Sequence, residues 1–316
     1  MDNSNMPYSL AIGIEIGGTK IQVGVGSASG KLLKPPIRKQ VIQEDGAEGI
    51  LRNIVGMAAE VLDSTGHSMS DVERIGIGFG GPLNIEQGVI LKSYQISGWD
   101  NFPLKKWAKA QWGKPVVIQN DASTAGLAEA LHGSGRGHSR IFYMTIGSGI
   151  GGGWIVDGTV DNGQGFGSAE MGHTWVTDPR TGMPAELEQV CSGWGIGRRA
   201  RAAVENKNSL MTEMAGSLND IDARIVHAAA EKGDELANLI LAETCQMLGL
   251  AVSNVIALLH PERIIIGGGV SLMGPLFWDA LRNEVMQRSM PSFISSVELV
   301  KAELGEDVVV IGALCL

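Results

Sequence analysis

Asp121 is the residue whose type and position most directly suggest catalysis. It follows Asn120 at the end of the β-branched run KPVVIQND, and the helix-like stretch ASTAGLAEALHG comes next. At a strand end, oriented by Asn120, its carboxylate could accept a proton from a substrate hydroxyl as a general base. The alternative is a structural role as the N-cap of the following helix. Both roles stay open on local grounds, and one residue could serve both.

Glu170 and His173 form a second polar group, within QGFGSAEMGHTW. Both are metal-ligand types, but no second histidine lies at helical spacing, and Asp178 is the only nearby third candidate. The sequence therefore favours hydrogen-bonding groups over a metal site. Glu188, just before a helix-like stretch, is the next carboxylate that could reach the same site.

Two glycine-rich turns could bind anions through consecutive backbone N–H groups: Gly17–Gly18–Thr19, with Lys20 beside it, and GSGIGGG at 147–153. Each could equally be a hairpin that uses glycine for steric reasons. Facing one another, the two could clamp a polyphosphate. The dinucleotide fingerprint fails, because its spacing is wrong and a second strand follows the turn. The Walker pattern is absent too.

Alternating strand and helix patterns surround these residues. Residues 9–26 and 141–156 each read as two strands joined by a glycine turn, and further strands are expected at 74–83, 114–121 and 262–270. Helices are expected at 46–66, 122–133, 188–206, 234–260 and 275–286. This predicts an α/β protein with an N-terminal domain 1–121 and a larger domain 122–302. The segment 303–316 is ambiguous: Val308–Val310 favour a strand, whereas a helix would suit packing back onto the first domain.

The composition excludes several functional classes. The formal net charge is −9, and the one basic cluster, RRAR at 198–201, is expected on the solvated side of a helix, so nucleic acid is not an expected partner. The three cysteines form no paired spacing for disulfides or zinc. With no signal sequence and no run of about 18 apolar residues, we expect a soluble cytoplasmic protein that does not bind a membrane.

The motifs together resemble those of the ROK family of sugar kinases and repressors, within the larger actin-like group. They follow the family order over nearly the whole chain: IEIGGTKI, GFGGPL, QNDASTAGLAEA, TIGSGIGGG, AEMGH, EQVCSG and HPERIIIGGGVS. The resemblance implies a two-lobed actin-like ATPase fold, related to ribonuclease H, with the active site in the interdomain cleft. It also implies transfer of the γ-phosphoryl group of Mg·ATP to a hexose hydroxyl, usually O6.

The resemblance also implies residue roles. Asp121 would be the catalytic base, and Asn120, Glu170, His173 and Glu188 would bind the sugar. Gly17, Gly18, Thr19 and Lys20 would line the first phosphate turn, Gly147, Gly149 and Gly151 the second, and Gly267, Gly268 and Gly269 the adenosine site. Repressor members carry a DNA-binding domain ahead of this fold, which the short segment before Gly17 is not expected to hold. The family is often dimeric, which implies a homodimer.

Three departures from the family pattern bear on these roles. Glu15 replaces the usual Asp near Mg²⁺, SAEMGH replaces AGEIGH, and the stretch after His173 lacks the CxCGxxGC cluster of zinc-containing members, so no structural zinc is expected. The hexose therefore stays open, including an N-acetylhexosamine or fructose, as does polyphosphate in place of ATP. The competing hypotheses are a sugar-binding sensor without catalysis and, more distantly, a metal-dependent hydrolase that uses Glu170 and His173.

Overall fold

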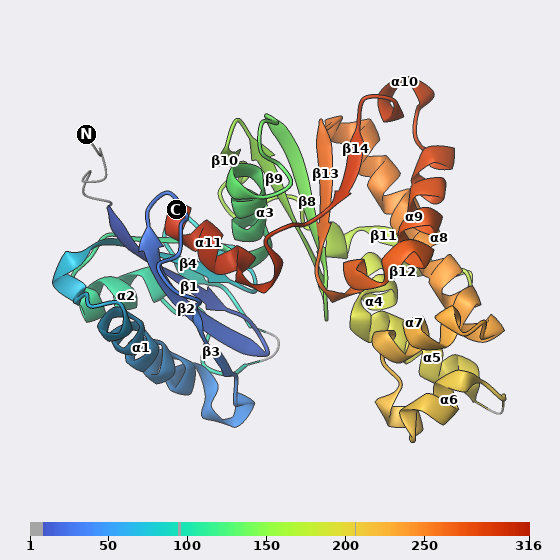
Figure 1. The fold of residues 1–316 in the computed structure, drawn as a ribbon, viewed down its shortest axis with the longest axis horizontal. Coiled ribbons are helices and arrows are strands. Elements are labelled where there is room, and N and C mark those ends of the chain that lie inside the picture. The colour runs from blue at the N-terminus through green and yellow to red at the C-terminus, as the bar shows by residue number, and fades with distance from the viewer. Residues whose placement is uncertain (1–8, 94–95, 206) are drawn as a thin grey trace, which may run out of the picture. The chain divides into compact units, whose positions relative to one another are not determined.

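The computed structural model describes residues 9–93, 96–205 and 207–316, and its chain forms two compact units (Figure 1). The first unit takes the chain up to Ser139, together with Gly153–Ser168 and Glu303–Leu316. The second takes Arg140–Gly152 and Ala169–Ala302. Strands and helices alternate, so the expected α/β class is confirmed.

The first unit is built on a five-stranded sheet in the order β3-β2-β1-β4-β7. Its strands are β1 (Leu10–Ile16), β2 (Lys20–Ser27), β3 (Ile37–Gln40), β4 (Val72–Phe79) and β7 (Val116–Asn120). The hairpin expected at residues 9–26 is present, with Ile16 opposite Ile21, and the Gly17 N–H donates to the Lys20 carbonyl at 3.0 Å. β1, β4 and β7 run parallel, so their carboxyl ends lie at one edge of the sheet.

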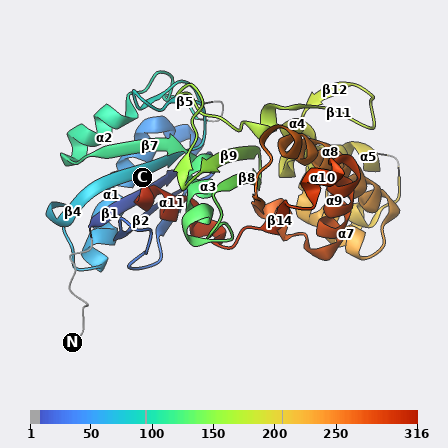
Figure 2. The same cartoon turned by 90° about the horizontal axis from the view of Figure 1, so that it is seen from above.

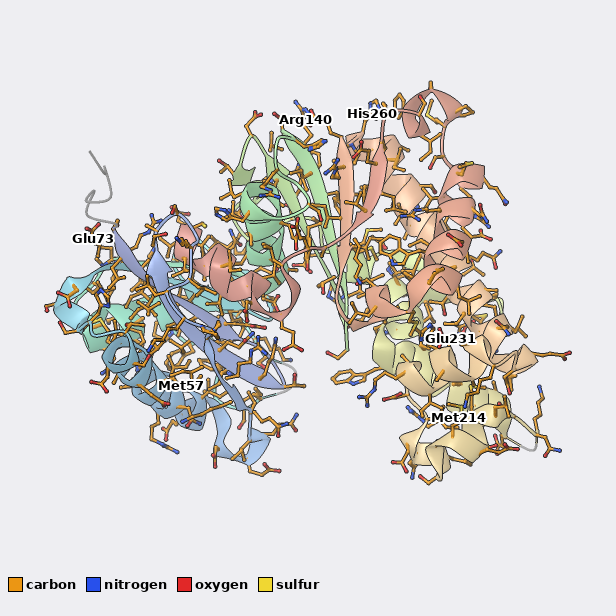
Figure 3. The ribbon with its side chains drawn as sticks, in the orientation of Figure 1. Met57, Glu73, Arg140, Met214, Glu231 and His260 are labelled. Atoms are coloured by element: carbon orange, nitrogen blue, oxygen red, sulfur yellow. The ribbon has the colours of Figure 1, made fainter. Side chains whose placement is uncertain are left out.

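Helices cover both faces of this sheet. One face carries Ile12, Ile14 and Ile16, which form a core with α1 (Gly46–Ser64) and α2 (Leu104–Trp112). Met57 of α1, labelled in Figure 3, is fully buried in that core. The alternation of side chains along a strand therefore places Gly13 on the opposite face.

Glycines on that opposite face admit the C-terminal helix α11 (Val308–Cys315), which lies against the sheet in Figures 1 and 2. A Cβ on Gly13 would lie 2.4 Å from the Val310 carbonyl oxygen, and one on Gly76 would lie 1.8 Å from that of Ala313. Only glycine permits so close a backbone approach. The ambiguous C-terminal segment is thus a helix, and its valines are buried or half-buried rather than paired in a sheet.

The second sheet has the order β10-β9-β8-β13-β14. Its strands are β8 (Arg140–Ile146), β9 (Ile150–Val156), β10 (Thr159–Val160), β13 (Arg263–Gly267) and β14 (Glu298–Lys301). β8, β13 and β14 run parallel, with Gly267 opposite Thr145. The expected strand–turn–strand pattern at 141–156 and the strand within 262–270 are therefore confirmed.

Helices make up most of the second unit: α4 (Leu187–Cys191), α5 (Gly193–Val204), α6 (Leu210–Ala215), α7 (Ala223–Glu231), α8 (Glu235–Leu259), α9 (Gly274–Arg288) and α10 (Pro291–Ile294). The helix expected at 188–206 is in fact two, because Ser192 is extended and caps α5 by accepting a hydrogen bond from the Gly195 N–H at 3.1 Å. Within the described part of the chain, α8 alone is long and apolar enough to cross a membrane. Most of its apolar window is buried inside the protein, as core helices commonly are.

The remaining α-helix is α3 (Asp121–His132), and the remaining strands form the pair β5 (Leu83–Asn84) and β6 (Val89–Ile90) and the hairpin β11 (Trp175–Thr177) and β12 (Pro184–Glu186). α3 packs against α11, and a Cβ on Gly312 would lie 2.0 Å from the Thr124 carbonyl oxygen. The first compact unit therefore includes α3 and extends to Ser139. The expected boundary after Asp121, between an N-terminal and a larger C-terminal functional lobe, stays a prediction.

Candidate functional site

Asp121 and the first glycine turn lie at the same edge of the first sheet. Ile16 is opposite Phe79, and Phe79 is opposite Asn120, so the three parallel strands end together. The Gly80 N–H donates to the Ile16 carbonyl at 2.9 Å. A Cβ on Gly80 would lie 2.9 Å from Asp121 Oδ2. The strand ends thus bring a carboxylate and a glycine turn to one place, at the carboxyl edge where functional groups of parallel sheets commonly lie.

The N-cap of α3 is Asn120, so the interpretation of Asp121 as the N-cap is wrong. Asn120 Oδ1 accepts a hydrogen bond from the Ser123 N–H at 3.1 Å, and Asp121 is the first residue of the helix. Asp121 Oδ1 accepts from the Ala122 N–H at 2.8 Å. Burial raises the pKa of the Asp121 carboxyl, and the backbone hydrogen bonds oppose this shift. A raised pKa suits a general base.

Glu15 lies on the strand before the first turn and is buried. It accepts a hydrogen bond from Gln22 Nε2, and its Oε2 is 3.6 Å from Lys20 Nζ. Burial raises the pKa of Glu15, whereas Lys20 and Gln22 lower it and the nearby Asp121 charge raises it further. Two carboxylates and one lysine beside a glycine turn are a donor set that fits Mg²⁺ and phosphate oxygens.

The second glycine turn is braced by two helices of the second unit. Glu188 Oε2, on α4, accepts from the Ile150 N–H at 2.8 Å, and a Cβ on Gly149 would lie 2.4 Å from that oxygen. The Gly193 N–H at the start of α5 donates to the Gly147 carbonyl at 2.7 Å. Gly151 already belongs to β9. The structure thus joins Glu188 directly to the turn.

Gly267, Gly268 and Gly269 lie at the same sheet edge as that turn, because β13 is parallel to β8. Gly268 has φ +83°, and a Cβ there would lie 2.5 Å from the Ile146 carbonyl oxygen. A side chain at this position would therefore be both strained and crowded. The segment 267–269 therefore packs its backbone against the end of β8, directly before the second glycine turn.

The segment Ala169–His173 is packed against the start of β9. A Cβ on Gly152 would lie 2.2 Å from the Ala169 carbonyl oxygen, and one on Gly172 would lie 2.3 Å from that of Ile150. Ala169 has φ +61°, a left-handed conformation that alanine rarely adopts. Glu170 and His173 are exposed.

His173 and Glu188 are brought close through neighbouring residues. His173 Nδ1 lies 3.4 Å from Glu186 Oε2, and a Cβ on Gly172 would lie 3.3 Å from the Glu188 Cβ. These contacts place the segment that carries His173 next to α4, which carries Glu188. Sequence reasoning missed Gly80, Gly152 and Glu186. GFGGPL and GIGGG signalled the two glycines, but Glu186 carried no comparable signal.

No group of three or more His, Cys, Asp or Glu side chains suited to a metal ion occurs among residues 9–93, 96–205 and 207–316. Cys191, Cys245 and Cys315 are free thiols, and Cys191 and Cys245 are buried. Burial raises the pKa of Cys245 to about 12 and that of Cys315 to about 11. These thiols therefore stay protonated near neutral pH and are poor nucleophiles.

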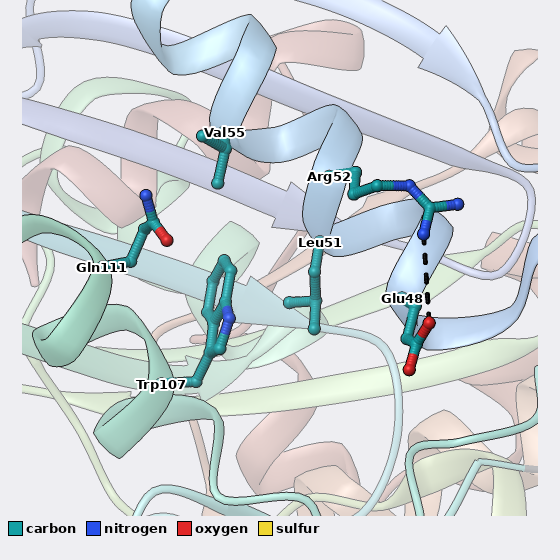
Figure 4. A pocket seen from close by; sticks show the side chains of 6 residues that line it. All are labelled: Glu48, Leu51, Arg52, Val55, Trp107 and Gln111. Carbon is teal, nitrogen blue, oxygen red and sulfur yellow. Dashed lines mark ion pairs between the residues drawn. The ribbon is translucent and has the colours of Figure 1, made fainter.

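A separate hollow of about 450 Å³ lies between α1 and α2 (Figure 4). Its lining residues are Glu48, Leu51, Arg52, Val55, Trp107 and Gln111, and Glu48 and Arg52 form an ion pair at 3.9 Å. None of the predicted site residues lines it. This hollow is therefore not part of the candidate site at the sheet edges.

Comparison with known proteins finds glucokinases that match nearly the whole chain. The chain is 35% identical over 314 residues to a glucokinase of Thermotoga maritima, covering 98% of this chain and 97% of that protein. It is 33% identical to a glucokinase of Halalkalibacterium halodurans, covering 95% and 92%. The crystal structure of a ROK family glucokinase from Streptomyces griseus in complex with glucose and AMPPNP aligns with TM-score 0.80 and 30% identity, covering 96% and 98%. The model of the ROK family matches residues 11–316, and this chain belongs to the ROK family.

Proposed function

We propose that this chain is an ATP-dependent hexokinase of the glucokinase type. It transfers the γ-phosphoryl group of Mg·ATP to a hexose hydroxyl, most simply O6 of glucose or a related hexose. The observation that carries the proposal is the meeting of Asp121 and the Gly17–Gly18–Thr19 turn at one sheet edge. A base beside a phosphate-binding turn is what phosphoryl transfer to a hydroxyl requires.

Asp121 acts as the general base. Its carboxylate accepts the proton of the sugar hydroxyl while that oxygen forms its bond to the γ-phosphorus and the bond to the β–γ bridging oxygen breaks. The raised pKa of Asp121 brings its basicity closer to that needed near neutral pH. Asn120, Glu170, His173 and Glu188 hold the other sugar hydroxyls, since each hydroxyl can both donate and accept hydrogen bonds.

The glycine turns hold the nucleotide. Gly17, Gly18, Thr19 and Lys20 bind phosphate oxygens from one side, and Gly147, Gly149 and Gly151 form the second phosphate turn. Gly267, Gly268 and Gly269 lie along the adenosine. Glu15 would help to hold Mg²⁺, which when bound would neutralise charge on the phosphate oxygens. Without the ion, the positive charge of Lys20 offsets the negative charge of Glu15, since Lys20 Nζ lies 3.6 Å from Glu15 Oε2.

A coupled assay of ADP release tests the proposal. Purified protein is mixed with Mg·ATP and, separately, glucose, mannose, fructose, N-acetylglucosamine or N-acetylmannosamine, and each product is identified by mass spectrometry. We expect turnover with at least one hexose, and a parallel series with polyphosphate identifies the donor. Sugar binding without product from any donor would instead support the sensor hypothesis.

We further propose that the enzyme works as a cytoplasmic homodimer. Trp175, Met183 and Leu258 of the second unit expose 67%, 64% and 82% of their surface. Contiguous apolar surface can mark contacts between subunits, and these three side chains are candidates for such a contact. Light scattering after size exclusion should give twice the chain mass of 33.4 kDa. A mass of one chain at micromolar concentration would contradict the dimer.

A further inference from the structure

The hairpin formed by β11 and β12 joins two of the proposed sugar ligands. His173 precedes it, and Glu188 follows it in α4. The base of the hairpin is closed by the Leu187 N–H, which donates to the Thr174 carbonyl at 2.8 Å, and by the contact of His173 with Glu186. The spacing of His173 and Glu188 therefore depends on how the two strands of this hairpin are held.

The tip of this hairpin is tied to helix α8. Arg180 lies in the turn, where its N–H donates to Asp178 Oδ1 at 3.0 Å. Its side-chain Nε donates to Glu243 Oε2 at 2.8 Å. An arginine–carboxylate contact is directional because the guanidinium is planar and its donors are fixed. The contact thus fixes the position of the tip on α8.

Arg199 of α5 reaches the same carboxylate oxygen from the other side. Its Nη2 donates to Glu243 Oε2, and its Nη1 donates to Thr244 Oγ1 at 3.0 Å and to the Val190 carbonyl at 3.4 Å. Val190 lies in α4, two residues after Glu188. Glu243 is therefore the common point that joins the hairpin, α5 and α8, and through Arg199 also α4.

These three charges are largely shielded from water. The exposed fraction is 6% for the Arg199 side chain, 13% for Glu243 and 24% for Arg180. Arg199, which the sequence placed on a solvated face, is buried in the helix packing, and burial lowers its pKa while the Glu243 charge opposes that shift. Removing one member of a buried charge group leaves the other side chains without a counter-charge in a place that water hardly reaches. The three side chains are therefore held in a fixed arrangement.

We propose that Glu243 is a positioning residue for sugar binding, which holds Arg180 and Arg199 so that His173 and Glu188 keep their spacing. The proposal rests on the sugar-kinase function given above. It assigns no contact between Glu243 and any substrate. The first phosphate turn and Asp121 belong to the other compact unit and should not be affected, whereas the second glycine turn is linked to this group through the contact of Glu188 with the Ile150 N–H.

The test is steady-state kinetics of Glu243→Gln, which keeps the shape and removes the charge. We expect the KM for the sugar to rise about tenfold, because small displacements of binding groups have large effects. The KM for Mg·ATP should rise less than the KM for the sugar, since no nucleotide contact is removed and the second glycine turn is reached only indirectly, through the contact of Glu188 with the Ile150 N–H. Glu284→Gln is the matched control, because Glu284 pairs with Arg288 on α9 within the same unit. It should leave both constants unchanged.

Arg180→Gln gives a second measure, because Arg180 lies in the turn of the hairpin and is the most exposed of the three charged side chains. It should raise the KM for the sugar in the same direction, and Arg180→Lys should recover part of the loss. The double variant with Glu243→Gln should be less than additive, as expected for residues that act through one contact. Wild-type KM values for the sugar in both single variants would overturn the inference. Failure of wild-type protein to phosphorylate or bind any sugar would instead overturn the proposed function.

Discussion

At the scale of single residues, Asp121 is the group whose chemistry can be tested most directly. Replacing it with asparagine keeps the size and removes the base, so kcat should fall by about 10²- to 10⁴-fold while sugar binding survives. Isothermal titration with the sugar and the ADP-release assay measure the two effects. Asp157→Asn, in the exposed turn after β9, is the control and should leave kcat unchanged. A variant at position 121 that kept wild-type turnover would exclude the base assignment.

The pH dependence of the wild-type enzyme follows from the same carboxyl. Burial raises the pKa of Asp121, and the base works only when deprotonated. Therefore kcat/KM should fall as the pH drops through this raised value, above the ordinary aspartate pKa of about 3.9.

Gly152 is a second residue-scale test, because its missing side chain decides where Glu170 lies. A Cβ there would lie 2.2 Å from the Ala169 carbonyl oxygen, so Gly152→Ala must displace the segment before Glu170. We expect a loss of about 1–3 kcal/mol in the free energy of unfolding and a higher KM for the sugar. Gly56→Ala on the exposed side of α1, where a Cβ meets nothing within 4 Å, should instead stabilise the protein by about 0.5–1 kcal/mol. Equal effects of the two changes in urea titrations would contradict this account.

At the scale of elements, the sequence predicted those features that depend on local pattern. The two glycine hairpins and the strand before Asp121 follow from the alternation of residues and from glycine, and the structure confirms them. The break at Ser192 was missed, because the apolar pattern continues across it. The burial of Arg199 was missed because its partner, Glu243, is 44 residues away in the sequence. Contacts between residues so far apart in the sequence leave no pattern in the residues next to either one.

Glu129 of α3 provides the prediction at this scale. It is buried, and its carboxylate accepts the N–H groups of Ser134, Glu303 and Leu304 at 2.8–2.9 Å, which fixes the segment that leads into α11. Glu129→Gln replaces one acceptor oxygen with a donor, so the free energy of unfolding should fall by about 1–3 kcal/mol. Urea titration monitored by circular dichroism measures the loss, with exposed Glu60→Gln as the control.

The pH dependence of that loss has a defined sign. Burial raises the folded-state pKa of Glu129 above its ordinary value of 4.5, so the folded protein holds this proton more tightly than the unfolded chain. The stability linked to that proton is present below pH 4.5 and is lost as the pH rises through the raised pKa of the folded protein. The gap between wild type and Glu129→Gln should therefore narrow with rising pH. A gap that widened would show that the carboxylate form is the favoured one.

At the scale of the whole molecule, the candidate site residues are divided between the two compact units. Asp121 and the first turn belong to one, and Glu188, His173 and the second turn belong to the other. The motif order in the sequence was sufficient to select these residues. It could not supply the contacts that hold them, such as that of Glu188 with the Ile150 N–H, 38 residues apart.

This division predicts how ligands affect unfolding. A ligand that binds only the folded state at 100 times its Kd stabilises that state by about 2.7 kcal/mol. The preferred hexose and a non-hydrolysable ATP analogue should therefore each raise the melting temperature by several degrees, at about 1.5 °C per kcal/mol for a chain of 316 residues. Asp121→Asn should keep both shifts in melting temperature, whereas Glu243→Gln should reduce the shift with sugar more than the shift with nucleotide. Loss of the nucleotide shift in Glu243→Gln would mean that the charge group supports the whole second unit and not the sugar ligands alone.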